Sequence, residues 1–276
     1  WNLIPWSREY KAIAWFNHAV LNRWNVLLIA RLLGFGTPSP RLRGAGDNQK
    51  NIRVAWLYDT EGAEYLSAFK SARVLYDCVD DHAVQAGPDR NPKRVREEEA
   101  AIMQRADLVT VTSRKLYEDK KYQNPNVHLV LNAGDVELFL PLPEGESRAQ
   151  RGVGVGAAFA KASAPTVGTV GTLDAYKYDF HLIREVAQQQ PNWQYVFSAG
   201  TEVQKKNAAL EQLQVLSNVH IVSDIPRQRV PDYVQQFDVC MIPYRNSAYN
   251  AASFPLKFWE FMASGKPVVF SGLPEL

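Results

Sequence analysis

Short apolar runs alternate along the chain with segments whose apolar residues recur at helical spacing. These two patterns predict buried strands and amphipathic helices. In the first half, strands are expected at residues 52–58, 73–79, 107–112 and 127–131, and helices at 61–70, 92–105 and just after Ser113. In the second half, strands are expected at 166–170, 193–198, 219–222, 238–243 and 267–270, and helices at 179–190, 203–216, 231–236 and 253–264. Such alternation predicts parallel sheets covered by helices.

The composition changes between the first and second halves of this alternating pattern. Residues 140–165 are rich in Pro, Gly, Ala and Ser and lack sustained periodicity, which is typical of a linker with an inserted loop. A run of alternating glycines in it, Gly152, Gly154 and Gly156, has no clear strand before it and does not match the dinucleotide fingerprint. We therefore interpret this run as a flexible loop rather than a phosphate-binding loop.

The domain organisation follows from the two blocks. We predict an α/β protein with a Rossmann-like domain at 1–140, a linker at 141–164 and a second Rossmann-like domain at 165–276. Ligands of open parallel sheets bind beyond the carboxyl ends of the strands. A cleft between two facing sheets is therefore the expected active site.

Residues 8–33 read as one long helix with bulky apolar residues at helical spacing, among them Trp15 and Trp24. A buried core helix is the favoured interpretation. The basic residues and tryptophans of this segment leave peripheral contact with a membrane as the alternative.

The amino-acid composition limits the classes of protein to which the chain can belong. Of the 276 residues, 46% are hydrophobic and 22% charged, as in a globular protein, and a net charge of +2 without zinc-type spacing argues against a nucleic-acid partner. Cys78 and Cys240 lie in separate apolar runs and are expected to be inert core thiols, which favours a cytoplasmic protein. No run approaches the about 18–20 apolar residues of a membrane span. Because the chain starts at Trp1 and stops after a strand-like run, we expect both ends to be missing.

The most informative segment is residues 249–276, YNAASFPLKFWEFMASGKPVVFSGLPEL. Ser253 has the residue type of an N-cap, and Pro255 suits a first helical turn. The free N–H groups at this start, together with Lys257, favour an anion such as a diphosphate. Glu260 lies on the same side and can accept hydrogen bonds from the two hydroxyls of a ribose. The alternative is a surface ion pair between Lys257 and Glu260 on a core helix.

Three further segments carry candidate residues after a strand. Gly171 and Thr172 follow a strand in TVGTVGTLDAYKYDF, where glycine lets the backbone approach a phosphate. The alternative is a glycine that only leads the chain from strand to loop. In VLNAGDVELF, a tight turn is expected at Asn132 and Gly134.

Clustered acids end another strand, in VLYDCVDDH. Asp80, Asp81 and His82 suit acceptor binding, acid–base work or metal ligation. A capping role in the loop is the alternative, and no further ligand cluster supports a metal site.

Taken together, these segments resemble the GT-B glycosyltransferases of group 1, also called family 4, and within it bacterial enzymes that build teichuronic acid and other surface polysaccharides. Six stretches match in order, including REEEAAIMQRADLVTVTSRKL, NVHIVSDIPRQRVPDYVQQFDVCMIPY and PLKFWEFMASGKPVV. The resemblance implies two facing Rossmann-like domains, incomplete at both ends.

Residue roles carry over by position. The resemblance implies a donor-binding set of Gly171, Thr172, Ser253, Phe254, Pro255, Leu256, Lys257 and Glu260. It implies acceptor-side positions at Asp80, Asn132 and Gly134, and catalytic positions at Asp81 and His82. One departure is Ala252, where the family typically has a second glutamate, and another is that only Lys177 stands for the family's Arg and Lys after the glycine loop.

The function implied is metal-independent, retaining transfer of a hexosyl group from a nucleotide-diphosphate sugar to a saccharide or lipid-linked acceptor, with no cofactor. Competing hypotheses are a nucleotide-sugar epimerase of the same fold and, because of Ala252, a degenerate sugar-nucleotide-binding subunit. A third is a metal-dependent transferase using Asp77, Asp80 and Asp81.

Overall fold

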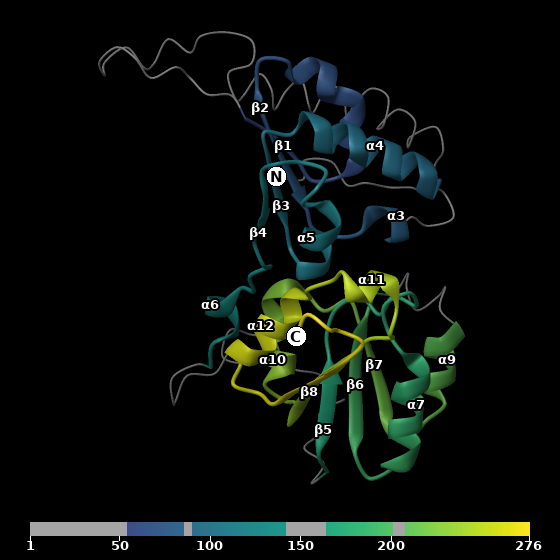
Figure 1. Ribbon diagram of the computed structural model, residues 1–276. Helices are drawn as coiled ribbons and strands as arrows, with labels where there is room; N and C mark the ends of the chain where they lie inside the picture. Colours follow the sequence, from purple (N-terminus) through teal and green to yellow (C-terminus); the bar gives the residue numbers. More distant parts are fainter. Residues whose placement is uncertain (1–53, 86–89, 142–163, 201–207) are drawn as a thin grey trace, which may run out of the picture.

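The computed structural model describes residues 54–85, 90–141, 164–200 and 208–276, which form two lobes, each built on a parallel sheet (Figure 1). The first sheet has the order β1-β2-β3-β4, with β1 at Val54–Leu57, β2 at Arg73–Cys78, β3 at Leu108–Val111 and β4 at Val127–Leu129. The second has the order β7-β6-β5-β8-β9, with β5 at Thr166–Thr169, β6 at Gln194–Ala199, β7 at Val219–Ser223, β8 at Val239–Pro243 and β9 at Val268–Ser271. The expected α/β class with two parallel sheets is confirmed.

Helical segments connect the strands. In the first lobe they are the 3₁₀ segment η2 at Thr60–Phe69, α3 at His82–Gln85, α4 at Pro92–Arg105 and α5 at Arg114–Lys120, followed by α6 at Val136–Phe139 near the second lobe. In the second lobe they are α7 at Phe180–Gln189, α9 at Ala208–Gln214, η5 at Arg227–Arg229, α10 at Val230–Val234, α11 at Ala248–Ala251 and α12 at Leu256–Ala263. Across the described ranges, no helix is long and apolar enough to cross a membrane.

Most expected elements form within one to three residues of their predicted ends. Local signals explain several boundaries: Asn91 caps α4 ahead of Pro92, and the Ser113 hydroxyl accepts the Leu116 N–H at the start of α5. The segment expected as a helix at 61–70 is 3₁₀ rather than α. The predicted helix at 8–33, the glycine run and most of the linker lie outside the described residues, so these predictions and the domain boundaries stay untested.

Each lobe has its own core, and each core includes a buried residue from the other half of the chain. Phe139, which precedes the linker, is buried in the core of the second lobe. Ala252, from the second lobe, is buried in the core of the first. Cys78 and Cys240 are free and fully buried, as expected, and burial raises the pKa of each thiol to about 12.

Hydrogen bonds also join the lobes at α5. The Glu275 carboxylate, near the end of the chain, accepts the N–H groups of Arg114 and Lys115 at 3.0 and 2.9 Å. With Ser113 capping Leu116, the first turn of α5 has its donors satisfied partly by the other lobe. A carboxylate at a helix amino end is also favoured by the helix dipole.

A buried ion pair links two helices in the core of the first lobe. Glu99 on α4 and Lys120 on α5 are 2.8 Å apart, with side chains 9% and 7% exposed. The same Glu99 oxygen accepts the Tyr76 hydroxyl at 2.9 Å and lies 3.6 Å from the Cys78 sulfur. A charge this deeply buried is tolerated because its partners satisfy it.

We predict that Glu99→Gln lowers the free energy of unfolding by about 3 kcal/mol, because Lys120 is left buried without a counter-ion. Urea denaturation checks this value. Glu97→Gln is the matched control on the same helix: its pair with Lys93 is exposed, so its effect should stay below about 0.5 kcal/mol. Equal effects of the two substitutions would contradict the prediction.

Candidate functional site

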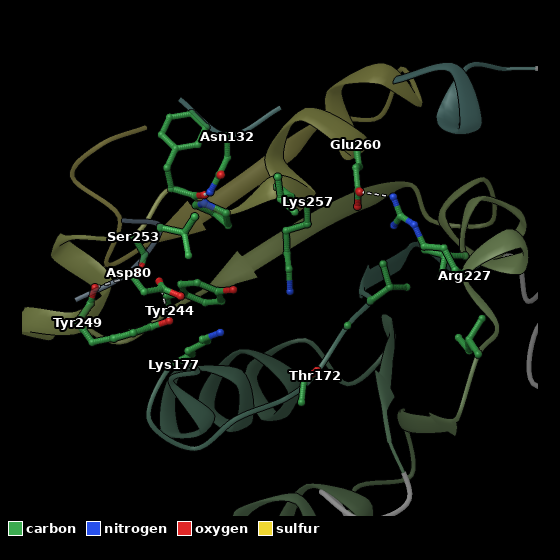
Figure 2. Close-up of a pocket in the computed structure, with 18 of the residues that line it drawn as sticks. Asp80, Asn132, Thr172, Lys177, Arg227, Tyr244, Tyr249, Ser253, Lys257 and Glu260 are labelled. Carbon is green, nitrogen blue, oxygen red and sulfur yellow. Dashed lines mark hydrogen bonds and ion pairs between the residues drawn. The ribbon is translucent and has the colours of Figure 1, made fainter. Parts of the chain in front are cut away.

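A cavity of about 680 Å³ opens between the two lobes and is walled by residues from both. Figure 2 shows several of its side chains, including Asp80 and Asn132 from the first lobe and Lys257 and Glu260 from α12. Its lining residues follow the carboxyl ends of strands in both sheets: Asp80 after β2, Asn132 after β4, Gly171 and Thr172 after β5, and Tyr244 after β8. The cavity therefore lies at the position predicted for ligands of facing parallel sheets.

The amino end of α12 opens into this cavity. The helix begins at Leu256, and its N-cap, Pro255, provides no side-chain hydrogen bond. Within the part of the chain that the structure describes, the N–H groups of Leu256 and Lys257 have no hydrogen-bond acceptor. Two unpaired donors at the positive end of a helix dipole form a ready site for an anion.

The predicted N-cap role of Ser253 is wrong. The Ser253 hydroxyl donates to the Tyr249 carbonyl at 3.0 Å and closes the short helix α11 instead. Pro255 explains the difference, because a proline disfavours helical backbone at the residue before it, Phe254. The helix therefore starts three residues after Ser253 and leaves its first donors uncapped.

Lys257 brings a positive charge to the uncapped helix end. Its ammonium group hydrogen-bonds to the Tyr178 hydroxyl and lies 5.0 and 5.7 Å from the ring centroids of Tyr178 and Tyr244. Among the described residues, no carboxylate oxygen lies within 4.0 Å of this group, so the expected alternative, an ion pair with Glu260, does not form. Burial, the largest cause, raises the pKa of both tyrosines, which stay neutral beside the lysine. The charge of Lys257 is therefore available to a ligand.

The glycine loop after β5 lies against this lysine. Gly171 has φ +115°, a conformation that side chains rarely adopt, and a Cβ added there would lie 3.2 Å from the Lys257 Nζ atom. The Gly171 N–H donates to the Ser198 hydroxyl at 3.3 Å. Gly171 thus leaves room beside the lysine, and Thr172 lines the same wall of the cavity.

Glu260 is buried, with 7% of its side chain exposed, and lines the cavity one helical turn from Lys257. Its Oε1 atom accepts a hydrogen bond from the Arg227 guanidinium at 2.5 Å. Sequence reasoning missed Arg227, which is 33 residues away in the chain and carries no local signal of this pairing.

Asp80 defines the other end of the cavity. Its Oδ1 atom accepts the Tyr249 hydroxyl at 2.9 Å, so the two lobes are joined at this point. Burial, the largest cause, raises the pKa of Asp80, while Tyr249 and Lys177 act in the opposite direction. The Lys177 ammonium lies 5.3 and 5.5 Å from the ring centroids of Tyr176 and Tyr249. This end thus combines a carboxylate, an ammonium and tyrosines.

Asp81 and His82 do not line the cavity as the structure describes it. The Asp81 carboxylate accepts the Val84 N–H at 3.1 Å at the start of α3, which is the capping role considered as the alternative. His82 is 8% exposed, and its Nε2 atom has no partner among the described residues. The catalytic assignment of both residues stays a prediction.

Comparisons with known proteins agree with this geometry. Residues 164–276 match the family model "Glycosyl transferases group 1". Residues 164–276 are thus similar to a group 1 glycosyltransferase domain, and the chain has the GT-B fold. Over 235 residues the chain is 33% identical to the putative teichuronic acid biosynthesis glycosyltransferase TuaH of Bacillus subtilis, covering 80% of this chain and 56% of TuaH. The chain thus spans little more than half the length of this relative.

Solved structures share the fold. Sucrose-phosphate synthase from Thermosynechococcus elongatus has a TM-score of 0.65 at 19% identity, over 98% of this chain and 63% of its own. Anabaena HepE, in complex with UDP-glucose, has a TM-score of 0.59 at 17% identity, over 88% of this chain and 62% of its own.

The loop that follows β4 packs against α12, within the segment that matches the family model. The Asn132 amide donates to the Phe254 carbonyl at 2.8 Å, just before α12. A Cβ added at Gly134 would lie 2.8 Å from the Trp259 Cβ atom and 3.1 Å from the Glu260 nitrogen. Gly134 therefore serves a close approach to α12; its φ is not positive, and it does not line the cavity.

Ala252 also lies in the segment that matches the family model. It is 2% exposed, packs in the core of the first lobe and does not line the cavity. A small apolar residue suits this position, since a carboxylate here would be buried among apolar side chains.

We predict that Gly134→Ala lowers the free energy of unfolding by about 1–3 kcal/mol, because the added methyl group overlaps the backbone and Cβ of α12. Gly200→Ala is the matched control, since among the described residues its Cβ would meet only the Asp224 carboxylate, at an ordinary 3.5 Å. Denaturation curves of the two variants check this. A Gly134→Ala variant as stable as Gly200→Ala would show that the close approach is not required.

Proposed function

We propose that this protein transfers a sugar from a nucleotide-diphosphate sugar to a hydroxyl group of an acceptor, in the synthesis of a surface polysaccharide. The observation that carries this proposal is the uncapped amino end of α12 beside Lys257, a cation without a carboxylate partner among the described residues. The family match, HepE with its UDP-glucose and the teichuronic acid relative support the same conclusion.

In this proposal, different residues along the cavity bind different parts of the donor. The N–H groups of Leu256 and Lys257, with the Lys257 ammonium, bind the diphosphate and stabilise its negative charge as it leaves the sugar. The Glu260 carboxylate accepts hydrogen bonds from the ribose hydroxyls. Because the helix end and Lys257 already supply positive charge, the proposed transfer needs no metal ion.

The acceptor belongs at the opposite end of the cavity in this proposal. Asp80 accepts a hydrogen bond from the acceptor hydroxyl while Tyr249 holds the carboxylate in place. The flanking tyrosines offer aromatic surface for a sugar ring. We propose a retaining hexosyl transfer to a saccharide or lipid-linked saccharide on the cytoplasmic side of the membrane.

We predict that Lys257→Ala weakens binding of UDP, GDP or ADP, whichever binds most tightly, by about tenfold or more, because a charge-assisted contact to phosphate is lost. Binding of inorganic pyrophosphate should be weakened by a similar factor, since pyrophosphate makes the same contact with Lys257. Isothermal titration calorimetry measures both affinities.

Lys266→Ala is the matched control for this experiment. Lys266 follows the carboxyl end of the same helix, and its ammonium donates to the Gln235 carbonyl at 2.9 Å, away from the cavity lining. The Lys266→Ala variant should bind the nucleoside diphosphate and pyrophosphate with the same affinities as the unaltered protein. Equal affinities for Lys257→Ala and Lys266→Ala would contradict the proposed diphosphate site.

A further inference from the structure

Arg227 is a cavity residue to which the proposed reaction gives no role. It begins η5, and 47% of its side chain is exposed, whereas the carboxylate that it contacts is 7% exposed. Figure 2 shows its guanidinium reaching toward Glu260 from the far wall of the cavity. A buried carboxylate needs such a partner, because an unpaired buried charge is costly.

The pair leaves acceptor capacity on Glu260. Oε1 accepts the Arg227 Nη2 at 2.5 Å, and among the described residues no side chain or backbone group donates to Oε2. A carboxylate has about four lone-pair sites over its two oxygens. Glu260 can therefore keep Arg227 and still accept two hydroxyl donors from a ligand.

Arg227 is itself held in place. Its guanidinium carbon lies 5.1 Å from the ring centroid of Phe139, which is fully buried at the end of α6. The negative charge of Asp135, at the start of α6, also acts on Arg227. Since Gly134 packs against the backbone of Glu260, one short segment, residues 134–139, supports both members of the pair.

We propose that Arg227 is a positioning residue: it fixes the Glu260 carboxylate so that its free oxygen faces the 2′- and 3′-hydroxyls of a nucleoside diphosphate. This inference rests on the proposed function. Arginine suits the role better than lysine, because a planar guanidinium fixes the direction of a carboxylate and stacks on an aromatic ring, whereas an ammonium does neither.

The experiment compares a ribonucleoside diphosphate with its 2′,3′-dideoxy analogue by isothermal titration calorimetry. The probe is the tightest binder among UDP, GDP and ADP. We expect the unaltered protein to bind the dideoxy analogue about tenfold more weakly or worse. In Arg227→Gln, affinity for the ribonucleotide should fall about tenfold, while affinity for the dideoxy analogue changes less than about twofold.

Three companion variants sharpen the result. Arg229→Gln removes the same charge in the same turn, but the guanidinium of Arg229 pairs with Asp232 at 2.7 Å, so ribose discrimination should persist. Arg227→Lys keeps the charge and should restore part of the discrimination; it also serves if Arg227→Gln fails to fold. Arg227→Gln combined with Glu260→Gln should be no worse than Glu260→Gln alone, since both act through one carboxylate.

The outcomes separate this inference from the proposed function. If none of the three diphosphates binds the unaltered protein, the proposed function fails and the inference fails with it. If the unaltered protein binds and discriminates, but Arg227→Gln discriminates equally well, only the role of Arg227 is overturned. Tighter ribonucleotide binding by Arg227→Gln would also overturn it, because Arg227 would then compete with the ribose.

Discussion

The uncapped amino end of α12 is the feature on which the rest of the site depends. A proline at the N-cap delays the helix to Leu256, and two N–H groups at the positive end of the helix dipole are left facing the cavity. Lys257 adds its charge at the same place and is held by a tyrosine rather than by a carboxylate. Water can satisfy these groups when no ligand is bound, and an anion bound there would also be stabilised by the helix dipole and by Lys257.

The first lobe holds this helix end in position. The Asn132 amide binds the Phe254 carbonyl, Gly134 packs against Trp259 and Glu260, and Tyr249 binds Asp80 across the boundary. Ala252 and Phe139 each pack in the core of the other lobe. The residues that we propose for the donor nucleotide and those that we propose for the acceptor are thus held in one cavity by direct contacts between the lobes.

Much of this architecture could be predicted from the sequence because its signals are local. Apolar runs give the strands, Ser113 and Asn91 give helix starts, and the order of motifs gives two facing sheets. The cavity walls at Asp80 and Gly171 follow, since residues just beyond parallel strands share one edge, and Lys257 follows from the expected start of the last helix. The N-cap at Ser253 was wrong because the proline two residues later overrides the capping preference. The pair of Arg227 with Glu260 and the bond between Tyr249 and Asp80 depend on contacts between distant segments, for which no local pattern exists.

A crystal structure of the chain with a bound nucleoside diphosphate tests the central claim most directly. The account predicts a phosphate oxygen within about 3 Å of the N–H of Leu256 or Lys257, the Lys257 ammonium in contact with the same group, and the ribose beside Glu260. A diphosphate bound elsewhere in the molecule, with the amino end of α12 still unoccupied, would contradict it.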